Sequence, residues 1–254
     1  MKVTLITNTP DPQRLIETCA RISYNSKNDP FDPEVNSKFI RKLISMGHLS
    51  PFEHASATVL IENVSRTCSH QIVRHRIAAY SQRSGRYVEF DPKKCSFVVP
   101  SSVMKASPRA IEAANRAFDA AAECYGILVE EGVPKEDARF YLPQAEETSL
   151  YMTTNMHNWR HFLELRLDRH AQWEIQRVAR MVLAILHNIA PDCFHDIACS
   201  FLGLGAGTDS NTVNTELTKY VVANIPDVRK ELVDNAVRDV TKSMVGHLAE
   251  ALPQ

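Results

Sequence analysis

The sequence predicts a mixed α/β fold of the α+β type, with a body over residues 1–202 and a helical C-terminal extension over 203–254. Short β-branched, alternating runs occur between longer segments whose apolar residues recur every three or four positions. A stretch rich in Gly, Ser, Asn and Asp at 203–211 then precedes two further amphipathic segments. With 254 residues, 44% of them hydrophobic, the chain can bury a full core.

The body begins with a predicted strand and two predicted helices. Residues 2–7 alternate in the manner of a strand, and residues 11–22 have helical periodicity. A second helix is predicted over 33–46, because Gly47 is a typical helix stop. The run ASATVLIENV is rich in β-branched residues and predicts a strand over 55–64.

The middle of the chain predicts one more strand and the clearest helix. Residues 95–100 predict the strand. The long helix begins at the pair Ser107 and Pro108, a cap followed by proline in the first turn, and continues to Gly132. A short helix is predicted over 134–142.

The last part of the body and the extension are predicted to be mostly helical. Residues 147–155 predict a strand, and 156–168 a helix. Residues 172–190 repeat apolar side chains in the pattern of a core-facing helix. In the extension, helices are predicted over about 212–224 and 227–249.

The composition excludes several classes of protein. The chain has 29 basic and 30 acidic residues, a balance unlike that of a protein that coats nucleic acid or an anionic membrane. No apolar run approaches the roughly 20 residues of a membrane helix. The N-terminus is predicted to be a strand rather than a signal peptide. The six cysteines are scattered without a C-x-x-C pair, which favours a reduced, cytoplasmic protein without a zinc cluster.

The most unusual stretch is RHRIAAYSQRSGRY, residues 74–87. Between Glu62 and Glu89 the chain carries five arginines and no acid. Arginines beside serines and a glycine suit a phosphate site, because guanidinium groups pair bidentately with phosphate oxygens. The alternative is a solvated basic loop. Apolar neighbours favour partial burial, so we expect these arginines to lack protein partners and to bind an anion. They are Arg66, Arg74, Arg76, Arg83 and Arg86.

The predicted helix over 156–168 carries further polar side chains. Arg166 falls inside its apolar face, and Asn155 lies within about 20° of that face at 100° per residue. Such an arginine either extends its head group to water or awaits an anionic or polarisable partner, and both alternatives stay open. His157 and His161 have the i, i+4 spacing of zinc ligands, but no third ligand is evident, so we expect no metal.

Two further segments present polar side chains. In GHLSPFEHASATV, residues 47–59, a turn exposes His48, Ser50, Glu53 and His54, which as surface residues would need no function. Arg139, in KEDARFYLP, would ordinarily be an exposed residue of a short helix.

Taken together, these segments resemble the flavin-dependent thymidylate synthase family. The resemblance rests on RHR with seven residues before a serine and then GRY, and on four blocks in the family's order. These are GHLSPFEH, ARFYLP, N-x-H-x3-H-F-x-x-L-R and HAQWEIQ. It covers roughly residues 15–195.

The resemblance implies a fold, a reaction and an assembly. The fold would be mixed α/β around a central antiparallel sheet. The reaction would convert dUMP to dTMP with methylenetetrahydrofolate as carbon donor, NADPH as reductant and non-covalent FAD as hydride relay. The assembly would be a homotetramer with active sites shared between subunits.

The resemblance also implies roles for residues matched one by one. Arg166 would activate the uracil, and Ser84, Arg86 and Arg139 are the strongest phosphate candidates. The dUMP-binding positions are Gln71, Arg74, Gln82, Arg83, Ser84, Gly85, Arg86, Arg139 and Arg166. The flavin-binding positions are Ser50, Arg74, His75, Arg76, Gln82, Asn155, His157 and His161, with His48, Glu53 and His170 near the flavin.

Some positions depart from the family. Some family members carry a carboxylate at the position of Gln82, an arginine at that of His157 and an asparagine at that of His161, and the extension matches no recognised part of the family. Two other readings are a nucleic-acid-binding module and an inactive homologue. The first is disfavoured by the balanced charge and by only two tyrosines in the basic stretch. The second is disfavoured because no key position is visibly broken.

Overall fold

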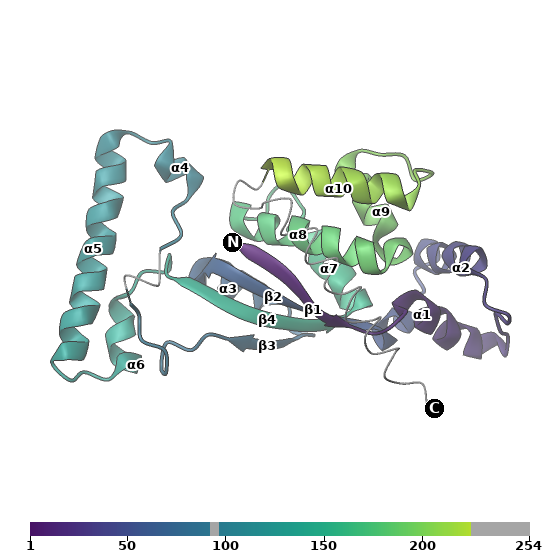
Figure 1. The fold of residues 1–254 in the computed structure, drawn as a ribbon, viewed down its shortest axis with the longest axis horizontal. Helices are drawn as coiled ribbons and strands as arrows, with labels where there is room; N and C mark the ends of the chain where they lie inside the picture. Colours follow the sequence, from purple (N-terminus) through teal and green to yellow (C-terminus); the bar gives the residue numbers. More distant parts are fainter. Residues whose placement is uncertain (92–96, 225–254) are drawn as a thin grey trace, which may run out of the picture. The chain divides into compact units, whose positions relative to one another are not determined.

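The computed structural model describes residues 1–91 and 97–224 (Figure 1). The elements over these residues are, in chain order, β1 (Lys2–Asn8), α1 (Pro12–Arg21), the 3₁₀-helix η1 (Ile22–Tyr24), α2 (Pro33–Ser45), the 3₁₀-helix η2 (Ser50–His54), β2 (Ser56–Ser65), α3 (Arg66–Ile72), β3 (Ala79–Gln82), α4 (Ser101–Met104), α5 (Pro108–Glu130), α6 (Lys135–Ala138), the 3₁₀-helix η3 (Arg139–Tyr141), β4 (Glu147–Asn155), α7 (Met156–Arg166), α8 (Trp173–Ile189), α9 (Pro191–Leu202) and α10 (Ser210–Asn224).

The four strands form one antiparallel sheet in the order β1-β2-β4-β3. Burial alternates along β2 and β4, as expected for strands with one covered face. Between these two strands, the hydroxyls of Thr58 and Thr153 share a hydrogen bond of 2.9 Å. Just past β3, the backbone N–H of Arg83 donates to the carbonyl of Ser149 at 2.9 Å. The predicted mixed fold with a central antiparallel sheet is confirmed.

The chain forms two compact units, and β2, β3 and β4 each contribute residues to both. Unit 1 comprises residues 1–61, 75–80 and 151–254, and unit 2 comprises residues 62–74 and 81–150.

The core of unit 1 is built around α8. This helix packs against α7, α9 and α10 (Figure 1). Trp159 and Phe162 of α7 and Phe194 of α9 are fully buried, and the Trp159 indole N–H donates to the backbone carbonyl of Ala57 at 3.2 Å. The first helix of the predicted extension, α10, also buries apolar side chains at four-residue intervals. The boundary proposed at 202/203 stays a prediction.

Unit 2 contains α3, α4, α5 and α6, with a small apolar cluster of its own. Phe90, Tyr125 and Ala138 are buried together, and the backbone N–H of Phe90 donates to the Tyr125 hydroxyl at 3.1 Å. Phe97 stacks on Phe118 of α5, with ring centroids 4.6 Å apart. This cluster packs α5 and α6 against Phe90, which follows the arginine-rich stretch by three residues.

Most predicted elements are present within two residues of their expected ends. The strand expected over 95–100 is wrong for residues 97–100. Among those residues only Phe97 forms a β-bridge, to Glu146, and a single bridge is too short to make a strand. Its ring packs against Phe90 and Phe118. The structure also contains elements that were not predicted, namely α3, α4, β3, α9 and the 3₁₀-helices η1 and η2. The helix expected over 227–249 lies outside the described residues. No helix in the described part of the chain is long and apolar enough to cross a membrane.

Candidate functional site

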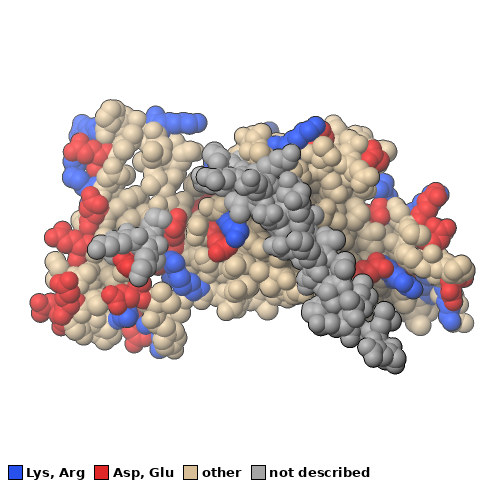
Figure 2. Space-filling model, in the orientation of Figure 1, with Lys and Arg blue, Asp and Glu red and all other residues tan. Residues whose placement is uncertain are grey.

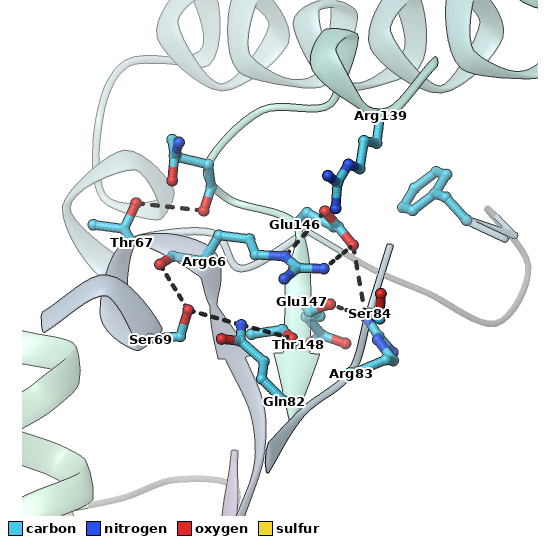
Figure 3. Close-up of polar contacts among 12 residues, drawn as sticks. Arg66, Thr67, Ser69, Gln82, Arg83, Ser84, Arg139, Glu146, Glu147 and Thr148 are labelled. Carbon is cyan, nitrogen blue, oxygen red and sulfur yellow. Dashed lines mark hydrogen bonds and ion pairs between the residues drawn. The ribbon is translucent and has the colours of Figure 1, made fainter. Parts of the chain in front are cut away.

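The first group of candidate residues lies in unit 2, where arginines from both sides of residues 75–80 gather, some of which Figure 3 shows. The Nε and Nη2 atoms of Arg66 each lie 3.3 Å from an oxygen of the Glu146 carboxylate. Arg83 lies 3.9 Å from the same carboxylate and also donates to the backbone carbonyl of Glu147. Arg86 pairs with Glu136 at 2.8 Å. The expectation that these arginines lack protein partners is therefore wrong for three of them, because glutamates distant in the sequence partner them.

Gly85 lies where two arginine side chains meet. A Cβ atom built on Gly85 would lie 3.2 Å from Cδ and 3.7 Å from Nη1 of Arg139, and 3.6 Å from Nη2 of Arg66. The absence of a side chain thus lets two guanidinium groups approach the same point of the backbone. Such close approach of donors to a glycine is suited to an anionic group.

Gln82 and Ser84 come shortly before Gly85: Gln82 is the last residue of β3, and Ser84 lies two residues after it. The Ser84 hydroxyl accepts from the backbone N–H of Arg86 at 3.2 Å, which shapes the turn. The Nε2 amide of Gln82 donates to Ser69 Oγ at 3.0 Å and Thr148 Oγ1 at 3.2 Å (Figure 3). An uncharged amide therefore suits this position, because it donates to two hydroxyls.

The remaining two unit 2 candidates lie at the C-terminal end of α3. Gln71 is half-buried within that helix, and Arg74 is exposed two residues after it ends.

His75 and Arg166 contact each other in unit 1. The Nε of Arg166 donates to Nε2 of His75 at 2.9 Å, and the His75 ring packs edge-on against Phe162. Burial, with the nearby positive charge of Arg166 and then His161, lowers the pKa of His75 to about 4. The ring is therefore neutral near neutral pH, and its proton resides on Nδ1 because Nε2 accepts. Arg166 is half-buried rather than fully desolvated, and its partner is a polarisable ring.

Two hydrogen bonds hold the backbone around His75. The Tyr80 hydroxyl donates to the carbonyl of His75 at 2.8 Å, and the Thr154 hydroxyl donates to the carbonyl of Ile77 at 2.6 Å. Burial raises the pKa of Tyr80 to about 12, so the phenol keeps its proton. The segment after Arg74 thus has a defined path although Arg76 and Ile77 are exposed.

The histidines of α7 lie beside η2, which packs against that helix. Nδ1 of His157 lies 3.1 Å from the Glu53 carboxylate, so Glu53 orients the ring. The Asn155 side-chain oxygen accepts from the N–H of Asn158 at 2.9 Å and caps α7. Contacts of Asn155 to a ligand would fall to its amide nitrogen.

Four further candidates in unit 1 are exposed. Ser50 and His48 lie at the start of η2 and just before it, and His161 lies one turn after His157. His170 follows α7 and its Nδ1 lies 2.9 Å from the Asp168 carboxylate. Exposure leaves these side chains accessible to a ligand or to another chain.

The predicted residues thus fall into two groups. The dUMP-binding positions lie in unit 2 except for Arg166, and the flavin-binding positions lie in unit 1 except for Arg74 and Gln82. Among the described residues, no group of three or more His, Cys, Asp or Glu side chains could hold a metal ion.

The buried arginine of α7 is Arg160, which the sequence analysis did not single out. Its Nη1 and Nη2 atoms pair with Asp196 at 2.8 and 2.7 Å, and Nη1 also donates to the carbonyl of Cys193 at 2.6 Å. At 100° per residue Arg160 lies about 40° from Met156, inside the apolar face, so the periodicity contained the signal. This pair joins α7 to α9.

The distribution of charged side chains over the surface is unlike that of a protein with one basic face. On the face shown in Figure 2, positive and negative side chains of the described residues are interspersed. A protein that binds along a nucleic acid concentrates Lys and Arg on one face. In unit 2, Arg66 and Arg83 instead share the carboxylate of Glu146, and Arg86 pairs with Glu136.

The fold and the two groups of side chains define an α/β protein with an arginine-rich site suited to a small anionic ligand. Comparison with known proteins is more specific. The family model described as "Thymidylate synthase complementing protein" matches residues 4–192. The chain therefore belongs to this family, and the predicted resemblance is confirmed.

Several relatives have the same printed name, "Flavin-dependent thymidylate synthase". The Geobacter sulfurreducens protein is 43% identical over 201 residues, which are 77% of this chain and 86% of the relative. The Pyrococcus horikoshii protein is 39% identical over 193 residues, 72% of this chain and 78% of the relative. The Clostridium tetani protein is 35% identical over 215 residues, 76% of this chain and 85% of the relative.

Proposed function

We propose that this protein is a flavin-dependent thymidylate synthase that methylates dUMP to dTMP. The observation that carries the proposal is the family match over residues 4–192, which contains every candidate residue from His48 to His170. Methylenetetrahydrofolate would donate the carbon and NADPH would reduce the flavin. The fold, the arginine cluster of unit 2 and the neutral His75 beside Arg166 are all consistent with this activity.

The phosphate of dUMP would bind at the arginine cluster of unit 2. Ser84, Arg86 and Arg139 would be its main partners, because charge-assisted hydrogen bonds to phosphate are the strongest available. Gln82 would act in binding only, since an amide at this position carries no charge. The phosphate does not change charge during the reaction, so these contacts would stabilise the ground state and the transition state alike.

Arg166 would act on the uracil ring. A half-buried guanidinium stabilises negative charge that develops at N3 and O4 as C5 becomes nucleophilic. The hydrogen bond to His75 fixes the plane of the guanidinium and hence the direction of its terminal nitrogens. The role is catalytic, because the stabilised charge is larger in the transition state than in the substrate.

Most of the side chains that would hold a non-covalently bound FAD lie in unit 1. Ser50, His157 and His161 offer hydrogen-bonding groups on η2 and α7, which pack together, and Arg76 is an exposed cation for the cofactor's phosphates. When bound, FAD would supply the hydride that completes the methyl group. The residues that would hold it are Ser50, Arg74, His75, Arg76, Gln82, Asn155, His157 and His161, with His48, Glu53 and His170 nearby.

The remaining expectations also belong to this proposal. Active sites would be shared between the subunits of a cytoplasmic homotetramer. Residues 1–202 would form the catalytic domain, and 203–254 would influence assembly more than chemistry, because no matched candidate residue lies in that part.

The visible spectrum and a product assay test the proposal together. The purified full-length protein, reconstituted with FAD, should show an oxidised flavin spectrum that NADPH bleaches. With dUMP and methylenetetrahydrofolate present, dTMP should form. Release of FMN on denaturation would contradict the cofactor assignment. Salt-dependent DNA retention by a colourless protein without dTMP formation would favour the nucleic-acid-binding reading instead.

A further inference from the structure

Arg66 is one of the five arginines between Glu62 and Glu89, but it is not among the dUMP-binding or flavin-binding positions that the resemblance implies. Both its backbone and its side chain bond to Glu146. Arg66 is the first residue of α3, and its backbone N–H donates to the carbonyl of Glu146 at 3.0 Å. The side chain returns to the same residue, with Nε and Nη2 each 3.3 Å from a carboxylate oxygen. The side chain is 20% exposed and that of Glu146 12%, so the pair is largely withdrawn from water.

The guanidinium of Arg66 faces Gly85, as that of Arg139 does. Nη2 of Arg66 and Nη1 of Arg139 lie 3.6 and 3.7 Å from the point where a Gly85 Cβ would be. A guanidinium carries five N–H groups, and the two bonds to Glu146 use two of them. Arg66 can therefore keep its partner and still donate to a ligand held at Gly85.

The charges around this point are unequal. Three arginines (Arg66, Arg83 and Arg139) lie with two glutamates (Glu146 and Glu147) in the group drawn in Figure 3, which leaves a formal excess of one positive charge. Glu146 is shared, because Arg83 also lies 3.9 Å from it. One carboxylate divided between two guanidinium groups neutralises neither fully, so an added anion would be attracted.

We propose that Arg66 is a further substrate-binding residue, which contacts the phosphate monoester of the nucleotide, and that Glu146 is the positioning residue that aims it at Gly85. The inference rests on the proposed function, since that function names dUMP as the ligand. A phosphate monoester carries about −1.5 to −2 charges at neutral pH. That is enough to neutralise the single excess positive charge of this group of side chains. Arg66 and Arg139 would then bind its oxygens from the two sides of the glycine.

Equilibrium binding by the FAD-loaded full-length protein tests the inference. Ligand-observed NMR would give the dissociation constants of dUMP and of deoxyuridine, which lacks the phosphate. Arg66→Ala should weaken dUMP binding about 10- to 100-fold, the range for losing a hydrogen bond to a charged group, and leave deoxyuridine unchanged. Arg66→Lys, which keeps a charge for Glu146 but lacks the planar fork, should give an intermediate loss.

The matched control is Arg116→Ala. Arg116 lies on α5 in the same unit and pairs with Glu112 at 2.7 Å, so the substitution also removes one arginine from a glutamate. It should leave both affinities unchanged. If Arg66→Ala does not fold, the Arg66→Lys affinity decides, and a wild-type value overturns the inference.

Failure of the inference differs from failure of the proposed function. Wild-type protein that binds no dUMP would contradict the function. Wild-type protein that binds dUMP and forms dTMP, with Arg66→Ala binding dUMP equally well, would overturn the role of Arg66 alone. Equal weakening of dUMP and deoxyuridine by Arg66→Ala would show a structural role and also overturn it.

Discussion

The Nε of Arg166 donates a hydrogen bond of 2.9 Å to Nε2 of His75, although 91 residues separate them in the sequence. An arginine has no acceptor, so the imidazole must present its lone pair at Nε2 and carry its proton on Nδ1. The protonation state of His75, in the RHR segment, therefore depends on Arg166, the side chain proposed to activate the uracil.

Arg166→Ala should lower kcat by roughly 10²- to 10³-fold, the range for losing one preorganised charge-stabilising donor. Lysine should restore little, because a point ammonium lacks the fork that meets two ring acceptors. Single-turnover dTMP formation, bound FAD and thermal stability measure the effect. Arg169→Ala, an exposed arginine just after the helix, is the control. Near wild-type single-turnover rates in both Arg166 variants would refute the role.

The stability of the protein should fall as the pH falls from about 6.5 to about 4. The pKa of His75 is lowered to about 4 from its ordinary 6.5, so the unfolded chain binds a proton in this window that the folded chain does not. Urea unfolding at steps across the window should show a shallower loss for His75→Gln than for wild type. Parallel curves would contradict the expectation.

The same ring offers a direct titration. Arg166→Ala removes the second cause of the low pKa of His75 and leaves burial, the first cause, in place. The NMR midpoint of His75 should therefore rise in this variant but stay below 6.5. An unchanged midpoint would mean that the charge of Arg166 does not act on the ring.

Gly85→Ala should weaken dUMP binding while leaving the fold intact. The new Cβ would lie 3.2 Å from Cδ of Arg139, so that side chain must move. Gly85 is not among the glycines with positive φ, so its backbone accepts alanine. We expect a loss of about 1–2 kcal/mol in dUMP binding, near the lower end for a charged hydrogen bond. Gly126→Ala, on α5 with nothing within 4 Å, is the control and should leave binding unchanged.

Cys68→Ala should retain dTMP formation. Cys68 is fully buried in α3, which suits a small core residue rather than a thiolate nucleophile. Loss of its sulfur should cost about 1–2 kcal/mol of unfolding free energy, as for other small deletions in a core. A variant with normal folding and flavin content but no turnover would show that the thiol takes part in the reaction.

Arg160→Ala should be the most destabilising of the arginine substitutions in α7. Its side chain is 5% exposed, and removing one partner of a buried pair costs about 3–5 kcal/mol. The Asp196 side chain is 49% exposed and can regain water, so we expect a value of about 3 kcal/mol by urea unfolding. Glu164→Gln, 3.7 Å from Arg160 but exposed, should change stability by less than about 1 kcal/mol. Equal losses in both variants would contradict this assignment.

Local patterns determined most of the secondary structure. The cap and proline at Ser107 and Pro108 predicted the start of α5, and the apolar spacing predicted α8, because these signals depend on residues a few positions apart. The same reasoning failed for residues 66–82. Its arginines, histidines and serines have no apolar period, so neither α3 nor β3 was visible, and α9 follows α8 too closely to be separated by periodicity.

By itself the sequence also determined the family and the candidate residues, because the motif blocks keep their order and spacing along the chain. Only the tertiary structure decided what those residues touch. Arg66 meets Glu146 from 80 residues away, and His75 meets Arg166 from 91. Such pairs depend on where the folded backbone brings distant segments, and a charge in a sequence can be matched by any opposite charge that folding places near it. The excess of arginine between Glu62 and Glu89 was therefore evident from the sequence, but not which of those arginines the protein itself partners.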